Sequence, residues 1–544
     1  MKNLVLIVGL LFSFNIFSFP STADAQSGKA EDDRIWITMG SDIFDDLVKD
    51  PSFTLAVPLK SHASTKDVVV TELRSADLEK ISEFAHETVR RCPGFIAHDS
   101  REEAMAVLES FEKGRRIGLK SCQTPQMAID QQATVNPLLP SLSAANILAT
   151  IDHLSTAYTN RYYSYTSGQQ SALWIRDLWA GYAASRPDVS VTTYSHSFLQ
   201  PSVILTIPGS TLPDEIVVLG GHLDSIRGGG MSPTTSAPGA DDNASGIASL
   251  SEAVRVLLAN GFAPERTVKF MGYAGEELGL LGSGDIAEEH ANNGDNVVAV
   301  LQLDMTAFEG GSHDVGLIDD HTDVNLTAFV GDLIEEYQPG ITWTFATCGY
   351  GCSDHASWTA EGFPAAFSFE APFGQHNNLI HTGSDNLATI GNSADHALKF
   401  SKIALSFAIE AGSGGGDVPP PPVYPELTNG VSQVISATTG ELLNYQVEVP
   451  AGATDLVFRT TGSNGDADLY IGFGCPPTTS SFDCSSTTSN SNEECAIDPA
   501  QAGTYYVLVH AWSTFNDLSV EASFVASIFT DGFESGDTSA WVTP

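Results

Sequence analysis

Six side chains that can bind metal ions lie in one stretch of the chain, most of them where a predicted strand ends: His222, Asp242, Glu276, Glu277, Asp304 and His381. His222 follows the apolar run IVVLGG, and Asp304 follows VVAVLQL. Parallel strands end at the same edge of a sheet, and ligands collect at that edge. Two imidazoles with several carboxylates suit two zinc-like ions that share a bridging carboxylate. The pattern therefore predicts a two-metal hydrolase.

The two residues of the adjacent pair Glu276-Glu277 are expected to have different roles, one in metal binding and the other in proton transfer. Neighbouring carboxylates in one site repel, unless a cation neutralises one and the other can take a proton. In a two-metal hydrolase one Glu binds metal and its neighbour accepts the proton of the water, whose pKa the metal lowers from about 15.7 towards ~7. An isolated pair of this kind is usually an acidic helix N-terminus. The surrounding motifs favour the catalytic interpretation here.

Two of the motifs contain a second acid. On an extended segment residues i and i+2 share a face, so Asp224 in GGHLDS is expected to hydrogen-bond the other nitrogen of His222. Asp241 and Asp242 precede a helix predicted to begin near Ala244, where acids also serve as N-caps. The pattern alone does not decide which of these two acids binds metal.

The wider sequence predicts how these residues are positioned. Strands and helices alternate over residues 124–411, which predicts an α/β domain with a mainly parallel central sheet flanked by helices. Residues 412–422, GSGGGDVPPPP, have the composition of a linker. Short alternating strands separated by turns over 423–527 predict a small all-β sandwich domain. The tail, 528–544, is unassigned.

The first residues have the pattern of a signal peptide. Lys2 precedes the apolar run LVLIVGLLFSFNIF, and Ala23-Asp24-Ala25 supplies the small residues of a cleavage site. We predict that residues 1–25 are removed on export and that the protein is secreted and extracellular. The apolar run is shorter than the ~20 residues that span a bilayer. No later run is longer, so no membrane span is expected.

Residues 26–123 are predicted to be a propeptide that acts as an intramolecular inhibitor or chaperone. The net charge of −42 argues against nucleic acid as a partner. This segment nevertheless contains 14 of the 25 Lys and Arg residues. One hypothesis is that it covers the acidic catalytic domain electrostatically, in which case salt should weaken the contact. The alternative is a folding aid whose charges are merely solvated.

The seven cysteines fit an oxidising compartment. Cys348 and Cys352 are close enough in sequence to form a disulfide across a tight loop. A metal site is the alternative for this CxxxC, but no second Cys pair accompanies it. Two further disulfides are plausible, Cys92 with Cys122 and Cys484 with Cys495. Cys475 is then left without a partner.

Residues 124–411 closely resemble the M28 family of zinc aminopeptidases, particularly the secreted bacterial leucyl aminopeptidases. The resemblance rests on TNRYY, GGHLDS, APGADDNASGIA, YAGEELGL, LQLDMT, CGYGCSDHASW, PAAFSFE and IHTGSDNLA. It implies two Zn²⁺ per catalytic domain and peptide or protein N-termini as substrate. It also implies a cis peptide bond between Asp242 and Asn243.

The resemblance assigns a role to each metal-competent residue. Asp242 would bridge the two zinc ions. His222 and Asp304 would complete one zinc site, and Glu277 and His381 the other. Glu276 would be the general base that becomes the general acid.

The family also binds the N-terminal side chain of its substrate in an apolar pocket beside the metals. The Cys348–Cys352 disulfide would shape one wall, and His376 stands where we expect an aromatic residue. Burying a leucine-sized group gains ~2–3 kcal/mol, so large apolar N-terminal residues should be preferred. Any one of the pocket positions, taken alone, could be an ordinary residue of the hydrophobic core. The matching positions are Met305, Ile318, Tyr350, Phe367, Phe369, Phe373 and Ile380.

Residues 423–527 resemble the bacterial pre-peptidase C-terminal (PPC) domain through GDADLYIGFGCPPT, DCSSTTSNSNEEC and GTYYVLVHAWS. That domain is often removed on maturation. Two alternatives to an aminopeptidase stay open. One is a single-zinc glutaminyl cyclase or a carboxypeptidase on the same fold. The other is a non-catalytic binding protein whose working part is the sandwich.

Overall fold

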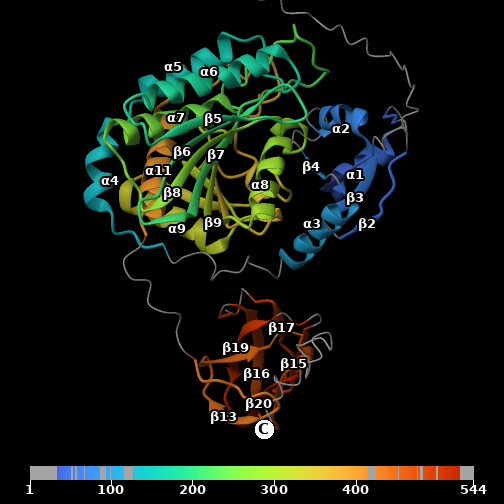
Figure 1. Cartoon of the computed structure of the whole chain (residues 1–544). Coiled ribbons are helices and arrows are strands. Elements are labelled where there is room, and N and C mark those ends of the chain that lie inside the picture. The colour runs from blue at the N-terminus through green and yellow to red at the C-terminus, as the bar shows by residue number, and fades with distance from the viewer. Residues whose placement is uncertain are drawn as a thin grey trace, which may run out of the picture.

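The computed structural model describes three folded units, which comprise residues 34–114 with short gaps, 127–414, and 424–526 with short gaps (Figure 1). The predicted signal peptide and C-terminal tail lie outside the described residues, as do Cys92, Cys122 and Cys475. None of the helices in the described parts of the chain is both long and apolar enough to span a bilayer.

The first unit is a small antiparallel sheet in the order β2-β3-β1-β4 with helices packed on it. Ile37, Ile43 and Phe95 belong to its own hydrophobic cluster. The β-branched run VVVTEL is part of β3, whereas the described residues of the apolar run FTLAVPL form no strand. Its elements are β1 (Arg34–Gly40), α1 (Ser41–Lys49), β2 (Ala63–Ser64), β3 (Val68–Arg74), α2 (Leu78–Phe84), β4 (Phe95–His98) and α3 (Arg101–Gly114).

The second unit is an eight-stranded mixed sheet in the order β11-β10-β12-β9-β7-β8-β6-β5. Its strands are β5 (Ser190–Tyr194), β6 (Ser202–Ile207), β7 (Leu212–His222), β8 (Arg266–Tyr273), β9 (Asn296–Leu303), β10 (Val315–Ile318), β11 (Trp343–Ala346) and β12 (Ala365–Phe369). Its longer helices are α4 (Gln132–Leu138), α5 (Ala144–Thr156), α6 (Thr166–Tyr182), α7 (Ala244–Ala259), α8 (Leu281–Asn293), α9 (Val324–Tyr337), α10 (His355–Ala360) and α11 (Asp395–Gly412).

The α/β class predicted from the alternating pattern is confirmed, with parallel pairing at the centre of the sheet. Strands β12, β9, β7 and β8 are mutually parallel, whereas β6 pairs antiparallel with β8, and β10 with β12. The connection between β5 and β6 is too short for a crossover helix, so those two strands also pair antiparallel.

Both faces of the central strands are covered, which explains their continuous apolar runs. Side chains alternate between faces with period two. Val217 and Leu219 of β7 pack into the large core that also includes residues of α5, α6, α7, α9 and α11. Val218 packs on the other face with residues of α8 and α10. The carboxyl ends of β7, β8, β9 and β12 therefore open at one edge of a rigid sheet.

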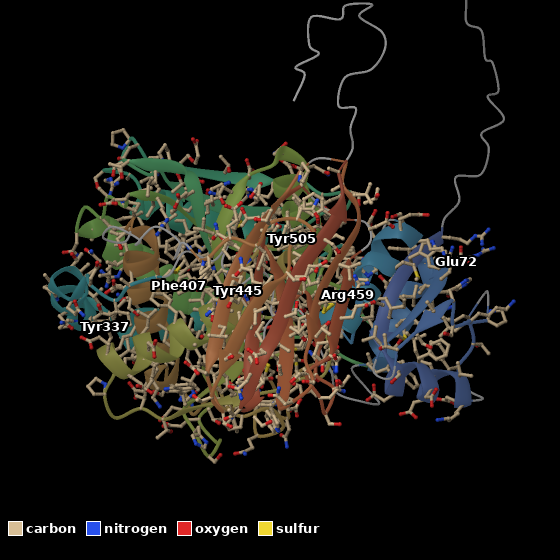
Figure 2. All side chains as sticks on the ribbon, turned by 90° about the horizontal axis from the view of Figure 1, so that it is seen from below. Glu72, Tyr337, Phe407, Tyr445, Arg459 and Tyr505 are labelled. Atoms are coloured by element: carbon tan, nitrogen blue, oxygen red, sulfur yellow. A yellow bond between two sulfur atoms is a disulfide. The ribbon has the colours of Figure 1, made fainter. Side chains whose placement is uncertain are left out.

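The third unit is the predicted β-sandwich. Two four-stranded antiparallel sheets, β13-β20-β15-β18 and β14-β19-β16-β17, enclose one core. Tyr445 and Tyr505 lie on neighbouring strands within it (Figure 2). The Cys484–Cys495 disulfide joins β17 to β18, and so one sheet to the other. The strands are β13 (Gln433–Ala437), β14 (Leu442–Val449), β15 (Thr454–Thr461), β16 (Asp466–Phe473), β17 (Cys484–Ser486), β18 (Glu493–Ile497), β19 (Gly503–Ser513) and β20 (Phe515–Val525).

Candidate active site

His222, Asp242 and Asp304 form one group of potential metal ligands at the carboxyl edge of the sheet. His222 is the last residue of β7, Asp304 follows β9, and Asp242 precedes α7. The Nε2 atom of His222 lies 3.0 Å from Oδ1 of Asp242 and 3.3 Å from Oδ1 of Asp304. All three side chains are buried. These three residues lie between 20 and 82 positions apart in sequence, and the fold brings them together.

A second group shares Asp242 with the first. The other oxygen of Asp242, Oδ2, lies 2.9 Å from Nε2 of His381. The same nitrogen lies 3.3 Å from Oε2 of Glu277. In each group the ligand atoms lie within 4.8 Å of one another. Asp242 therefore turns one carboxylate oxygen towards each group.

The donor set fits two zinc-like ions. Zinc takes imidazole nitrogen and carboxylate oxygen, and a carboxylate with an oxygen directed to each side can bridge two ions. The Nε2 atom of His222 and both carboxylate oxygens of Asp242 are fully buried, yet they make no hydrogen bond of proper geometry. Buried polar atoms are normally satisfied. A cation between them would satisfy these atoms.

Asp224 supports both a potential ligand and the catalytic loop. Its Oδ1 atom lies 3.3 Å from Nδ1 of His222, the contact expected from the spacing in GGHLDS. Its two oxygens also accept hydrogen bonds from the backbone N–H groups of Glu276 and Glu277, at 3.1 and 3.2 Å. One buried carboxylate thus orients the imidazole and fixes the start of the 3-10 helix Glu276–Leu278.

The site concentrates buried negative charge. Burial raises the pKa of Glu276 well above its usual range, and Glu277, Asp354 and Asp304 add to that rise although His222 opposes it. Burial lowers the pKa of the His381 imidazole, but Glu277 and Asp242 outweigh burial and raise that pKa to about 10. A bound cation relieves repulsion of this kind between carboxylates.

Of the two neighbouring acids Asp241 and Asp242, Asp242 is the one whose carboxylate lies beside the histidines. The Oδ1 atom of Asp241 accepts a hydrogen bond from the N–H of Ala307 at 2.9 Å, and its Oδ2 accepts one from Asn377 at 3.1 Å. Asp241 therefore faces away from the histidines. The peptide bond between Asp242 and Asn243 is cis, as the resemblance implied.

Some residues that support the ligands were not singled out from the sequence. The hydroxyl of Ser353 donates to Oδ2 of Asp304 at 2.7 Å, which leaves Oδ1 directed towards His222. The amide of Gln302 donates to Ser353 at 2.9 Å. Ser353 lies in the motif CSDHAS, so its position directly after Cys352 was the available signal.

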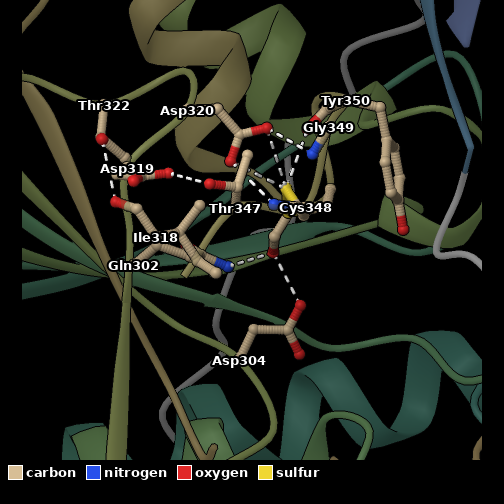
Figure 3. Close-up of a disulfide and its surroundings, with 12 residues drawn as sticks. Gln302, Asp304, Ile318, Asp319, Asp320, Thr322, Thr347, Cys348, Gly349 and Tyr350 are labelled. Carbon is tan, nitrogen blue, oxygen red and sulfur yellow. Dashed lines mark hydrogen bonds between the residues drawn. A yellow bond between two sulfur atoms is a disulfide. The ribbon is translucent and has the colours of Figure 1, made fainter. Parts of the chain in front are cut away.

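The predicted Cys348–Cys352 disulfide is present, and Asp320 holds its loop (Figure 3). The carboxylate of Asp320 accepts hydrogen bonds from the backbone N–H groups of Cys348 and Gly349, at 3.0 and 2.6 Å. The same loop carries Tyr350. Asp320 was not predicted, because nothing in the sequence indicates that residues 28 or more apart meet.

The predicted substrate-binding residues gather in one apolar cluster together with both cysteines of the disulfide. All except Ile318 also line a pocket that opens beside Asp304. His376 lines the same pocket, and its ring packs at centroid distances of 5.3 Å from Phe369 and 5.2 Å from Phe373. The gathered residues are Met305, Ile318, Tyr350, Phe367, Phe369, Phe373 and Ile380.

A third cluster of metal-competent side chains surrounds a lysine. Glu309, Asp314 and His396 have ligand atoms within 4.8 Å of one another. The ammonium group of Lys399 lies 2.6 Å from Asp314 Oδ1, 3.5 Å from Glu309 Oε1 and 3.1 Å from His396 Nδ1. The lysine supplies the positive charge that these groups require, so this cluster is not a metal centre.

Comparisons with known proteins agree with this geometry. Residues 202–406 match the model of peptidase family M28, and residues 443–511 match the bacterial pre-peptidase C-terminal domain. A probable leucine aminopeptidase of Arthroderma benhamiae is 38% identical over 288 residues, which cover 52% of this chain and 77% of that protein. Leucine aminopeptidase 1 of Arthroderma gypseum is 39% identical over 291 residues, covering 51% and 76% respectively.

A solved structure is similar over most of this chain. The LapA aminopeptidase of Legionella pneumophila superposes with a TM-score of 0.59 at 28% sequence identity, covering 70% of this chain and 99% of that chain. This chain aligns with more than two thirds of the length of each named leucine aminopeptidase, at 38% and 39% identity, and this match establishes the family. The chain therefore belongs to peptidase family M28 and is a metallo-aminopeptidase, a hydrolase of peptide bonds.

Proposed function

We propose that the protein is a secreted aminopeptidase with two zinc ions that removes large apolar residues, such as leucine, from peptide N-termini. The observation that carries this proposal is the pair of ligand groups sharing Asp242 directly beside an apolar pocket. His222 and Asp304 would hold one ion, and Glu277 and His381 the other. When bound, such ions polarise a carbonyl group and lower the pKa of a water.

In this proposal Glu276 moves the proton during hydrolysis. Its carboxylate takes the proton from the attacking water and later returns it to the departing amine. Asp224 fixes the backbone of Glu276, so the carboxylate starts from a defined position. The raised pKa of Glu276, caused first by burial, suits a group that must both accept and release a proton. Tyr350, which lines the pocket, would help to stabilise the oxyanion.

The pocket would select the substrate. Its walls are mainly aromatic and aliphatic, and transfer of a leucine side chain into such surroundings gains ~2–3 kcal/mol. His376 also lines the pocket, and its ring packs against Phe369 and Phe373. The relatives named leucine aminopeptidase support the same preference.

Secretion is the third part of the proposal. The N-terminal signal sequence and the two disulfides, Cys348–Cys352 and Cys484–Cys495, support an oxidising destination. The test is N-terminal sequencing of the protein recovered from the medium after expression in a secreting host. A mature chain that retains residues 1–25, or protein that stays inside the cell, would refute this part.

We further propose that residues 26–123 act as an inhibitor or chaperone by binding the segment that follows the catalytic Glu276, residues 277–280. The hydroxyl of Ser82 donates to the carbonyl of Glu277 at 2.8 Å, and the N–H of Ala97 donates to the carbonyl of Gly279 at 3.2 Å. Ile96 and Val107 pack against Leu280 and Ala356. Most of the described contacts are apolar or uncharged, although the hydroxyl of Tyr162 also donates to the carboxylate of Glu79 at 2.9 Å. They therefore favour docking that salt weakens little.

The propeptide proposal is tested on the full chain. Activity on a leucine anilide is compared before and after cleavage near residue 123, at several ionic strengths. Cleavage should raise activity, and the difference should change little between low and high salt. Ile96→Asp, which introduces a charge into the apolar contact, should raise the activity of the uncleaved chain. Equal activity before and after cleavage would defeat the inhibitor role.

Substrate choice tests the proposed activity itself. The processed enzyme is assayed on anilides of leucine, alanine and glutamate, and on the acetylated leucine anilide. The leucine compound should be cleaved fastest and the acetylated compound not at all, because a free α-amine is required. Preferential cleavage of the blocked substrate would reject an aminopeptidase, and a preference for glutamate would reject the assigned pocket.

A further inference from the structure

Arg161 lies in TNRYY, a motif that none of the roles above explains. Its side chain is only 1% exposed. The guanidinium donates from Nε to the carbonyl of Leu223 at 2.9 Å and from Nη2 to the carbonyl of Gly239 at 2.9 Å. It also donates from Nη1 to the carbonyl of Pro238. One rigid, planar group thus joins two loops that are 15 residues apart or more.

These two loops carry ligands of the first group. Leu223 directly follows His222, and Gly239 lies three residues before Asp242. A third segment is tied in as well, because Nη1 also donates to the carbonyl of Leu154 at the end of α5, at 3.3 Å. The distances between the N–H groups of a guanidinium are fixed by its planar fork. The separation of the two ligand-bearing loops is therefore set by covalent geometry.

The backbone of Arg161 extends the same connection to the loop of Glu276. The N–H of Arg161 donates to the hydroxyl of Ser225 at 3.0 Å, and that hydroxyl donates to the carbonyl of Ala237 at 2.8 Å. The carbonyl of Arg161 accepts from the amide of Gln200 at 3.1 Å. The Oε1 atom of Gln200 in turn accepts from the N–H of Gly275, at 3.3 Å.

The charge of Arg161 also matters to the site. Among the described contacts, every hydrogen bond of the guanidinium ends on a main-chain carbonyl rather than on a carboxylate. Burial lowers its pKa, and the nearby carboxylates of Asp385, Asp224, Asp242 and Glu277 act in the opposite direction. A buried cation is costly unless it is compensated. The acidic site supplies that compensation without direct pairing.

We propose that Arg161 is a positioning residue that fixes the loops of His222 and Asp242 relative to each other, and so determines the affinity of the first metal position. This inference rests on the ligand assignment made under the proposed function. Loss of a group that orients metal ligands commonly weakens metal affinity by about 10- to 100-fold. We expect an effect in that range from replacing Arg161 by lysine, which keeps the charge but loses the fork.

Arg266 provides a matched control. It is also buried, at 4% exposure, and it also donates to main-chain carbonyls, those of Ala411, Ser413 and Gly414. Unlike Arg161, it also pairs directly with a carboxylate, that of Glu215. It begins β8, at the end of the strand opposite to the one that leads to Glu276. If burial of any arginine among carbonyls were enough to affect the site, Arg266→Lys would weaken metal binding as much as Arg161→Lys.

The experiment measures zinc affinity by competition with a chromophoric chelator, together with the thermal unfolding of the metal-free chain. Arg161→Lys should bind zinc at the first position, that of His222 and Asp304, at least about tenfold more weakly than the unaltered protein does. Arg266→Lys should lower the unfolding temperature with zinc affinity unchanged. Equal zinc affinity in Arg161→Lys and the unaltered protein would overturn the inference. So would a loss of affinity in Arg266→Lys of the same size.

Two further variants complete the design. If Arg161→Lys does not fold, Ser225→Ala takes its place, because it removes one hydroxyl from the same hydrogen-bond connection. This variant should bind zinc several-fold more weakly than the unaltered protein. Unchanged zinc affinity in Ser225→Ala would overturn the inference. His222→Ala tests the ligand assignment on its own. Full zinc content in His222→Ala would refute the proposed function, whereas loss of zinc there with normal affinity in Arg161→Lys would refute only the role of Arg161.

Discussion

The carboxylate of Asp385 accepts hydrogen bonds from the backbone at Asp242. The Oδ2 atom of Asp385 accepts a hydrogen bond from the N–H of Asp242 at 3.1 Å, and its Oδ1 accepts one from the N–H of Asp241 at the same distance. Asp385 and Asp242 lie 143 residues apart and both are buried. The carboxylate thereby fixes the one residue that faces both ligand groups.

Replacing Asp385 by asparagine should destabilise this loop. An amide nitrogen cannot accept from a backbone N–H, so one buried donor would lose its partner at a cost of about 1–3 kcal/mol. We expect a lower unfolding temperature of the metal-free chain and weaker zinc retention on dialysis. Asp395→Asn, at an exposed position, serves as the control. Unchanged zinc retention would show that Asp385 does not support Asp242.

Replacing Glu276 by glutamine should abolish turnover without loss of metal. The amide cannot accept the proton of the attacking water, and loss of a general base typically costs 10²–10⁴-fold in rate. Zinc content by elemental analysis should stay that of the unaltered enzyme, because Glu276 is outside both ligand groups. Retention of more than a tenth of the activity would remove Glu276 from the mechanism.

Replacing Phe373 by alanine should reduce selectivity rather than activity. Phe373 is only partly buried at the edge of the pocket, and its ring packs on Phe369 at a centroid distance of 5.9 Å. Loss of part of the apolar wall should raise KM for a leucine anilide several-fold and leave KM for an alanine anilide nearly constant. An equal rise for both substrates would indicate general damage instead of a lost side-chain contact.

Asp320 should couple the stability of the disulfide loop to pH. Burial raises its pKa to about 6, although the N–H groups of Cys348 and Gly349 pull it down. The folded chain therefore takes up a proton between about pH 7 and 4 that the unfolded chain takes up only near its lower ordinary pKa of 3.8. By linkage this group makes folding more favourable as pH falls, by at most about 1.4 kcal/mol for each unit of pKa difference.

Asp320→Asn should remove that dependence, because asparagine does not titrate. The unfolding temperature of the unaltered protein, measured relative to that of the variant, should rise as pH is lowered from 7.5 to 4.5. Asp319→Asn, at the exposed neighbouring position, removes a charge that adds to the raised pKa of Asp320 but leaves the titrating group in place, so its pH profile should stay closer to that of the unaltered protein than the profile of Asp320→Asn does. Parallel pH profiles for the protein and Asp320→Asn would exclude Asp320 as the group responsible.

The sequence was informative wherever function requires a local pattern. His222 and Asp304 could be located because each follows a buried strand with an unbroken apolar run, and parallel strands end at one edge. The α/β class and the sandwich followed from similar periodicities. The antiparallel pairing of β10 with β12 was not foreseen, since strand direction at a sheet edge depends on the path of long connections.

Residues that act through tertiary contacts could not be found in this way. Arg161, Ser353 and Asp385 each make their contacts to segments distant in sequence. A lone arginine after an asparagine carries no periodic signal. Glu309, Asp314 and His396 show the opposite limit, because their residue types suit metal binding but Lys399 occupies their centre.

The number of zinc ions bound per chain tests the central claim most directly. We predict two ions in the unaltered protein and one in each of the variants His222→Ala and His381→Ala, because each histidine belongs to a different ligand group. Elemental analysis after dialysis against metal-free buffer gives these numbers. A single ion in the unaltered protein, or two ions in either variant, would contradict the account.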